Sequence, residues 1–274
     1  MIFLRHILCA CLLTLIAQGA WAGSRLETMD SRGDMLGWEA VGRIDLAGRG
    51  FCTGVLIAPD QVLTAAHCMY DKTTQAPLLA QDIVFRSGYL KGEALSERRG
   101  VKVVVAEGYV PGGNVTHIEN VRKDVAILKL DSPIFSSEAD PFRIAETGGP
   151  GTVQVMSYGQ DRSEAMSWQR SCALEQEVND LKLFDCDITF GSSGAPVFVK
   201  NGGRVRILSL VSGTAQLAGG RRIGVGMALG PVVAELRARL RYGDAPARQV
   251  SGGAKRIKIG GGGSASGAKF LRPN

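Results

Sequence analysis

Short apolar runs rich in β-branched residues, separated by Gly, Pro, Asp and Asn, fill the chain between residues 33 and 243. Runs of this length and composition predict strands, and no long helical pattern lies between them. Strands without intervening helices favour an antiparallel sheet over a βαβ arrangement. The sequence therefore predicts an all-β body. The clearest runs are 55–57, 101–105, 125–130, 153–156, 197–199 and 205–211.

One segment has convincing helical periodicity, and it closes this body. Residues 232–240 read VVAELRARL, with apolar positions at helical spacing. A helix at the end of a β domain is most often a packing element. We therefore expect a C-terminal α-helix without a further role.

The two ends of the chain differ in composition from the body. Residues 1–22 carry Arg5, an apolar stretch over 7–17 and the small-residue pattern Ala20-Trp21-Ala22, which is typical of a secretory signal peptide. The alternative, a signal anchor, is disfavoured because the stretch is short for a membrane span. Residues 23–34 are a short propeptide or a flexible start, and residues 35–243 are the predicted domain. A secreted or periplasmic location follows.

The formal net charge of +6 belongs to the ends and not to the body. Residues 244–274 contain six basic residues against one acidic residue, Arg5 adds one charge, and residues 23–243 sum to zero. The tail is rich in Gly, Ser and Ala and is predicted to be disordered. Its basic residues indicate either a solvated extension or contact with an anionic surface. No nucleic-acid partner is expected.

Four cysteines remain if the signal peptide is removed, since Cys9 and Cys11 lie within it. An even count in an exported chain indicates two disulfides. Of the three possible pairings, those close in sequence are favoured. A zinc site is disfavoured because no Cys-x-x-Cys pair occurs. The favoured pairs are Cys52 with Cys68 and Cys172 with Cys186.

Only three histidines occur, and His67 is the one suited to chemistry near neutral pH. His6 falls in the leader and His117 in a polar loop. Downstream of His67 come Asp124, at the start of an apolar run, and Ser193, within Gly191-Ser192-Ser193-Gly194. A serine hydroxyl becomes a nucleophile when an imidazole takes its proton and a carboxylate orients that imidazole. The chain offers these groups in the order His, Asp, Ser.

Four motifs carry a resemblance to a known family. Cys52-Thr53-Gly54-Val55-Leu56-Ile57, Thr64-Ala65-Ala66-His67-Cys68, Asp124-Val125-Ala126-Ile127-Leu128 and Gly191-Ser192-Ser193-Gly194-Ala195-Pro196 resemble the chymotrypsin-like (trypsin-fold) serine endopeptidases. The match is closest to the bacterial secreted branch that includes the glutamyl endopeptidases. It covers roughly residues 35–240.

The resemblance implies two six-stranded antiparallel β-barrels with the active site in the cleft between them. It implies that His67 is the general base, Asp124 its orienting partner and Ser193 the nucleophile. The backbone N–H groups of Gly191 and Ser193 would form the oxyanion hole, and the Cys52–Cys68 disulfide would brace the histidine loop. The substrate would be a protein or peptide, and no cofactor or metal is expected.

Two departures from the family pattern bear on activation and specificity. Ser192 stands where animal members carry an aspartate that pairs with a newly formed N-terminus, so we expect either an enzyme that is competent after export or a different activation route. Asp187, six residues before the nucleophile, is either a pocket carboxylate that selects Arg or Lys or an aspartate in a turn. Residues 210–214 lack the histidine of the glutamyl endopeptidases, so a glutamate preference is not expected. The substrate strand would be formed by Ser212, Gly213 and Thr214, and the pocket would be left open by Gly224 and Gly226.

Chain order separates this interpretation from other hydrolases. An α/β-hydrolase places Ser first and His last, and subtilisin-like enzymes place Asp before His. Two alternatives stay open: a catalytically silent protein that uses the same cleft as a binding module, and an envelope protein whose tail is the active part. The intact set of His67, Asp124 and Ser193 argues against the first alternative.

Overall fold

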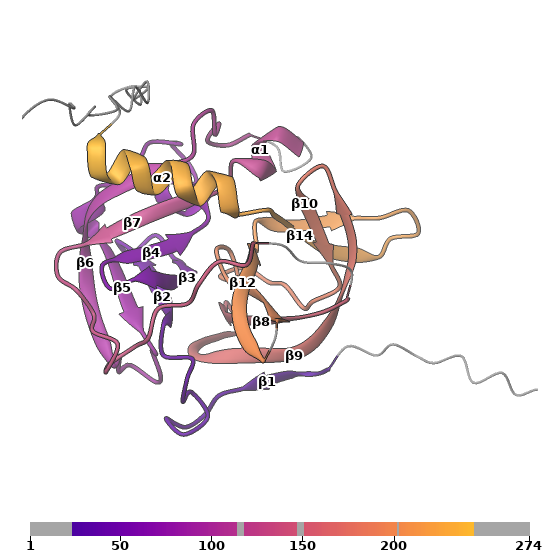
Figure 1. Ribbon diagram of the computed structural model, residues 1–274, viewed down its shortest axis with the longest axis horizontal. Helices are drawn as coiled ribbons and strands as arrows, with labels where there is room; N and C mark the ends of the chain where they lie inside the picture. Colours follow the sequence, from indigo (N-terminus) through magenta and orange to yellow (C-terminus); the bar gives the residue numbers. More distant parts are fainter. Residues whose placement is uncertain (1–23, 114–117, 147–150, 202, 244–274) are drawn as a thin grey trace, which may run out of the picture. The chain divides into compact units, whose positions relative to one another are not determined.

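The computed structural model describes residues 24–113, 118–146, 151–201 and 203–243. The predicted signal peptide and the basic tail lie outside these ranges. No helix within them is long and apolar enough to cross a membrane. The expected all-β architecture is confirmed, with two sheets and a helix at the end of the described chain (Figure 1).

The first sheet is a closed six-stranded barrel with strand order β2-β3-β4-β7-β6-β5. Every ladder in it is antiparallel, as expected for strands joined without crossover helices. Alternate side chains point inward, where Ile44, Leu56 and Phe85 are fully buried. The strands are β2 (Val41–Leu46), β3 (Phe51–Ala58), β4 (Gln61–Thr64), β5 (Ile83–Ser87), β6 (Ser96–Val105) and β7 (Ala126–Leu130).

The second sheet has eight strands and stays open among the described residues. Its order is β12-β11-β8-β9-β10-β14-β13, with β1 paired to β9. It therefore differs from the closed six-stranded barrel that the resemblance implied. The length and periodicity of apolar runs in the sequence predict strands. Whether a sheet closes into a barrel depends on which of its edge strands pair with each other. The strands are β1 (Leu26–Thr28), β8 (Gly151–Gly159), β9 (Arg162–Val178), β10 (Leu181–Phe184), β11 (Pro196–Asn201), β12 (Arg204–Leu210), β13 (Gly213–Gln216) and β14 (Arg222–Met227).

A shared hydrophobic core joins the barrel to the second sheet. Val55 and Leu63 from the barrel belong to the same buried cluster as Tyr158 and Phe198 from the sheet. This contact fixes the two sheets against each other, because burying apolar surface between them contributes about 25 cal/mol per Å² to the stability of the fold. Loops from both sheets consequently meet along the seam between them.

Two α-helices and two 3-10 helices complete the described part of the chain. The expected C-terminal helix is α2 (Gly230–Tyr242), which lies along β6 and β7 of the barrel (Figure 1). Its buried residues are Val233 and Leu236, which supports the expected packing role. The others are α1 (Ile118–Arg122) and the 3-10 helices η1 (Ala66–Met69) and η2 (Ala80–Asp82).

Candidate active site

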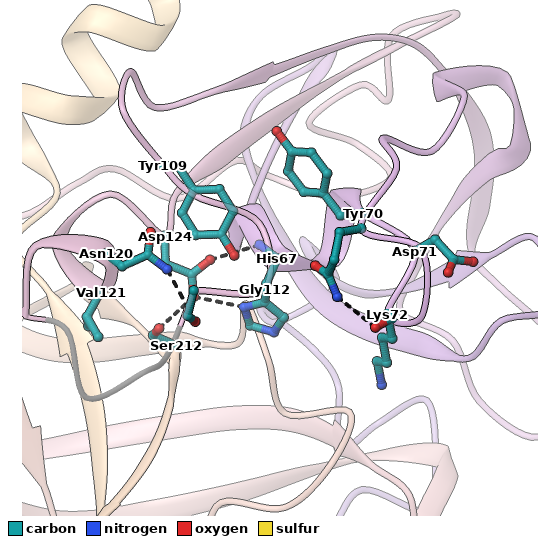
Figure 2. A pocket seen from close by; sticks show the side chains of 12 residues that line it. His67, Tyr70, Asp71, Lys72, Tyr109, Gly112, Asn120, Val121, Asp124 and Ser212 are labelled. Atoms are coloured by element: carbon teal, nitrogen blue, oxygen red, sulfur yellow. Dashed lines mark hydrogen bonds and ion pairs between the residues drawn. The ribbon is translucent and has the colours of Figure 1, made fainter.

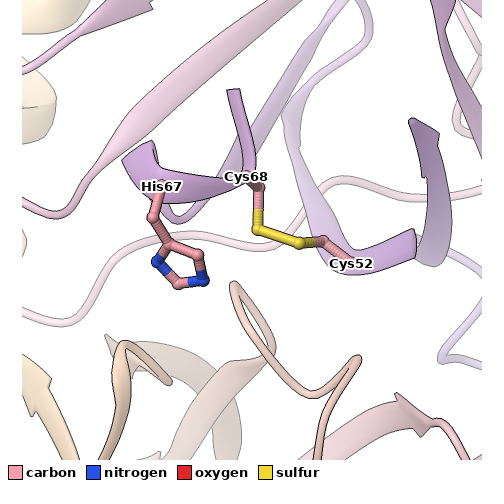
Figure 3. Close-up of side chains that lie close together, drawn as sticks. All are labelled: Cys52, His67 and Cys68. Atoms are coloured by element: carbon pink, nitrogen blue, oxygen red, sulfur yellow. A yellow bond between two sulfur atoms is a disulfide. The ribbon is translucent and has the colours of Figure 1, made fainter. Parts of the chain in front are cut away.

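His67 lies on η1, directly after barrel strand β4. The chain leaves β4 through Ala65 and Ala66, two fully buried small residues that let this turn pack into the barrel. Cys68 forms a disulfide with Cys52 of β3, with an S–S distance of 2.02 Å (Figure 3). The histidine is thus held at the end of a rigid strand and beside a covalent link.

Both favoured disulfides are present. The second joins Cys172 to Cys186 over a separation of 14 residues. Cys52, His67 and Cys68 place their ligand atoms within 4.8 Å of one another, which is close enough for a metal. The two sulfurs are bonded to each other, however, so neither is a thiolate ligand. This cluster does not fit a zinc site.

The carboxylate of Asp124 lies against His67 and is almost fully buried (Figure 2). One oxygen accepts the backbone N–H of His67 at 2.8 Å, and the other lies 2.8 Å from Nδ1 of the ring. An ionised carboxylate can only accept, so the proton is on Nδ1 and Nε2 is left as an acceptor. This is the tautomer that a general base requires.

Ser212 completes the environment of Asp124. Its hydroxyl donates to the same carboxylate oxygen that faces Nδ1, at 2.5 Å. The sequence assigned Ser212 to a substrate-binding strand, and nothing local in the sequence indicated that its side chain points to Asp124. The carboxylate therefore accepts three hydrogen bonds, which fix its orientation.

Asp124 raises the pKa of His67 above its ordinary value of 6.5. Burial is the largest influence and favours the neutral ring, but the charge and the hydrogen bond of Asp124 together outweigh it. Lys72 opposes protonation more weakly. The His67 side chain is still 32% exposed, so a substrate can reach it.

Ser193 lies in a turn whose backbone is set by two glycines. Gly191 and Gly194 have φ angles of +91° and +76°. A Cβ on Gly194 would lie 2.1 Å from Thr64 Oγ1 and 2.4 Å from the carbonyl oxygen of Thr53, so the turn presses directly against the barrel. Among the described residues, the N–H groups of Gly191 and Ser193 have no hydrogen-bond acceptor. Both amides are therefore free to bind a developing oxyanion.

Thr53 fixes the Ser193 turn from the barrel side, a contact that sequence reasoning did not find. Its backbone N–H donates to the carbonyl of Ser193 at 2.9 Å, and its hydroxyl donates to the carbonyl of Gly191 at 2.9 Å. The same hydroxyl accepts the N–H of Tyr158 at 3.0 Å. Position 53 follows Cys52 in the quoted motif, but Ser193, Gly191 and Tyr158 lie more than 100 residues away from it.

A cleft between the barrel and the second sheet contains both His67 and Ser193. Its volume is about 420 Å³. The described structure contains no hydrogen bond from the Ser193 hydroxyl to the His67 ring. Such bonds are often long before substrate binds. A smaller hollow of about 220 Å³ lies on the Asp124 side of His67 and is lined by Tyr109, among others (Figure 2).

The predicted substrate strand lies at the edge of the second sheet. β13 ends the sheet order and pairs with β14 alone among the described strands. Ser212, Gly213 and Thr214 line the cleft, so the free edge of β13 is accessible to an extended peptide.

The residues predicted to form a specificity pocket lie elsewhere. Asp187 is exposed and does not line the cleft, and its N–H donates to Gln169 Oε1 at 2.7 Å. A Cβ on Gly224 would lie 2.3 Å from the Phe184 ring, so protein side chains and not the cleft occupy that space. The space beside Gly226 is likewise occupied, because a Cβ there would lie 2.1 Å from the Leu210 carbonyl oxygen. The cleft is instead lined by the cations Arg49, Lys72 and Arg222.

Residues 33–231 match the family model described as Trypsin. Human serine protease 23 is 28% identical over 170 residues, which cover 54% of this chain and 43% of the relative. The glutamyl endopeptidase of Bacillus licheniformis is 25% identical over 158 residues, which cover 57% and 47%. The chain thus spans less than half the length of these curated relatives.

A solved structure of a Glu endopeptidase in complex with MPD shares the fold. The TM-score is 0.61 at 20% sequence identity, over 74% of this chain and 91% of that one. At this identity the likeness concerns the fold alone.

Proposed function

Because the chain belongs to the trypsin family of serine proteases, we propose that it is a secreted serine endopeptidase that hydrolyses peptide bonds through an acyl-enzyme on Ser193. His67 is the general base and Asp124 its orienting group. The observation that carries the proposal is the pair of hydrogen bonds from His67 to Asp124 beside a cleft that Ser193 also lines.

The proposed reaction follows from the protonation state of His67. Ser193 Oγ attacks the scissile carbonyl carbon while Nε2 takes the hydroxyl proton. The carbonyl oxygen becomes an anion and binds the N–H groups of Gly191 and Ser193. Losing one such donor typically costs about 3 kcal/mol of transition-state stabilisation. The imidazolium then protonates the leaving amine, and water, activated by the same ring, hydrolyses the ester.

A fluorophosphonate probe tests the nucleophile. Wild-type protein is expected to take up one label per folded molecule, and S193A none. S192A is the matched control, because Ser192 is the rival serine in the same turn; it should still take up one label. If S193A is still labelled, or if only S192A loses the label, Ser193 is not the nucleophile.

The second candidate function is a binding module without catalysis. The observation that favours it is the lack of a hydrogen bond between the Ser193 hydroxyl and His67 among the described residues. In that case folded wild-type protein would bind peptides along β13 but neither react with the probe nor release amine product. Peptide hydrolysis abolished by S193A would exclude it.

Export and the basic tail are part of the proposal and need separate tests. N-terminal sequencing of exported protein is expected to begin at Gly23, after Ala22. Deletion of residues 244–274 should abolish any binding to anionic vesicles and leave hydrolysis unchanged. Vesicle binding that persists after the deletion would assign the surface contact to the folded body.

We propose further that peptides with acidic side chains near the scissile bond are preferred. Among the described residues that line the cleft, three are cations and none is a carboxylate. Arg49 is paired with Asp71 at 2.9 Å, whereas the described residues hold no ion pair for Lys72 or Arg222. Residues 210–214 contain no histidine, which is why glutamate was not expected from the sequence. The cations that line the cleft come from other segments.

A peptide library with mapped cleavage positions tests this preference. Acidic peptides should be cleaved best, R222Q should reduce that advantage, and added salt should reduce it further, because exposed charges are screened. R221Q is the matched control: Arg221 is adjacent but pairs with Glu175 and does not line the cleft. Cleavage chiefly after Arg or Lys would instead favour a role for Asp187.

A further inference from the structure

The Ser192 side chain points away from the cleft and into the protein. Ser192 is fully buried, whereas Ser193 lines the cleft. The Ser192 hydroxyl lies 3.3 Å from Ser157 Oγ and 3.4 Å from the carbonyl oxygen of Tyr158, both on β8. Residue 192 sits between the two amides that would bind the oxyanion. Whatever holds its side chain also sets the direction of those amides.

The guanidinium of Arg162 lies beside this hydroxyl. Arg162 begins β9, and its Nη2 donates to Ser157 Oγ at 3.2 Å and to Ser192 Oγ at 3.5 Å. The space for it depends on Gly159, since a Cβ there would lie 2.0 Å from Nη1. The absence of a side chain at Gly159 therefore leaves the space that the guanidinium fills, and Arg162 does not line the cleft.

This position is costly for a cation. Nε and Nη1 of Arg162 are buried and have no hydrogen-bond partner in the described structure. Burial lowers the pKa of Arg162, and the charges of Asp161 and Asp187 only partly offset that effect. Arg162 as a whole is half-buried. Burying part of a charged group without hydrogen-bond partners still destabilises a fold, so an apolar side chain would fill this position at lower cost. The charge itself therefore requires an explanation.

We propose that Arg162 is a positioning residue for the oxyanion-binding turn: it holds Ser192 from behind and places a fixed positive charge next to the amides of Gly191 and Ser193. The inference rests on the proposed function of Ser193. It also gives the expected competence after export a physical basis. A side chain within the body supports the turn, so no newly formed N-terminus has to enter beside Ser192.

The test compares R162M and R162K with R237M. Methionine keeps the length of the side chain but removes its charge and its donors. Arg237 is the matched control because it too is partly buried with a lowered pKa, and it hydrogen-bonds to Ile57 and Gln61 of the barrel instead of the turn. For each folded variant, kcat and KM on a peptide amide are measured with the Ki of a peptide boronic acid, which mimics the tetrahedral anion.

In R162M, kcat should fall by about ten- to a hundredfold, less than for direct loss of an oxyanion donor. The boronate should bind more weakly by a similar factor, KM should stay within about threefold, and R162K should recover part of both losses. R237M should lower the melting temperature but leave kcat and boronate affinity unchanged. A folded R162M with wild-type kcat and boronate affinity, or an equal loss in R237M, would overturn the inference.

If R162M does not fold, S192A supplies the same test, because it removes the acceptor and leaves Arg162 in place. Weaker boronate binding at unchanged KM is expected, and unchanged boronate binding would overturn the inference. Failure of the proposed function looks different: wild-type protein itself would then neither hydrolyse peptides nor take up the fluorophosphonate.

Discussion

Replacing Asp124 by asparagine separates orientation of His67 from simple packing. The carboxylate accepts three hydrogen bonds: two from His67, through its backbone N–H and Nδ1–H, and one from the Ser212 hydroxyl. Asparagine has one oxygen and one NH₂ group. If its oxygen takes the backbone N–H, its NH₂ donates to Nδ1. The reverse orientation would set two donors against each other, which costs about 1–3 kcal/mol for a buried group.

The favoured orientation moves the ring proton to Nε2, so His67 can no longer accept the proton of Ser193. Loss of the correct tautomer in this type of triad lowers kcat by about 10⁴-fold. That factor corresponds to about 5 kcal/mol in the activation free energy.

The assay is hydrolysis of a peptide amide by folded D124N, together with the ¹⁵N chemical shifts of the His67 ring, which report the tautomer. S212A is the control, because it removes one donor to the carboxylate but keeps the carboxylate itself. It should lose far less activity than D124N. A D124N enzyme within about tenfold of the wild-type kcat, with its ring proton still on Nδ1, would refute the assignment of Asp124.

Three further predictions concern pH and stability. Since His67 must be neutral to act as a base and its pKa is raised, kcat/KM should be lost as pH falls through a pKa above 6.5; a midpoint at or below 6.5 would contradict this. Replacing Cys172 and Cys186 by alanine removes a disulfide between residues that are 14 positions apart in the sequence. In denaturant titrations the free energy of unfolding should fall by about 3 kcal/mol, while the activity per folded molecule stays unchanged. G194A and G48A share a φ of +76°, but only Gly194 faces close neighbours, so G194A should be about 1–3 kcal/mol less stable than G48A; equal melting curves would argue against tight packing of the turn.

His67 lines both the cleft and the smaller hollow on the Asp124 side. Tyr70, Lys72 and Ser212 also line both. Burial and the nearby Asp124 raise the pKa of Tyr109, so this phenol stays neutral in the smaller hollow and is available as a hydrogen-bond donor.

Sequence by itself determined the features that depend on neighbouring residues. Short β-branched runs predicted strands, the spacing of 232–240 predicted the closing helix, and the small separations of the cysteines favoured the two pairs that form. The motifs around His67, Asp124 and Ser193 identified the family, because each motif is local and their order along the chain can be read from the sequence alone.

Tertiary structure decided what depends on residues far apart in the chain. Sequence placed Ser212 on the substrate strand, but the fold turns its hydroxyl toward Asp124, 88 residues away. Thr53 reaches Gly191 over 138 residues, and Arg162 reaches Ser192 over 30. The exposure of Asp187 is likewise set by the packing of strands around it. No local pattern encodes these contacts, because they arise only when the barrel and the second sheet bury their common core and bring their loops together.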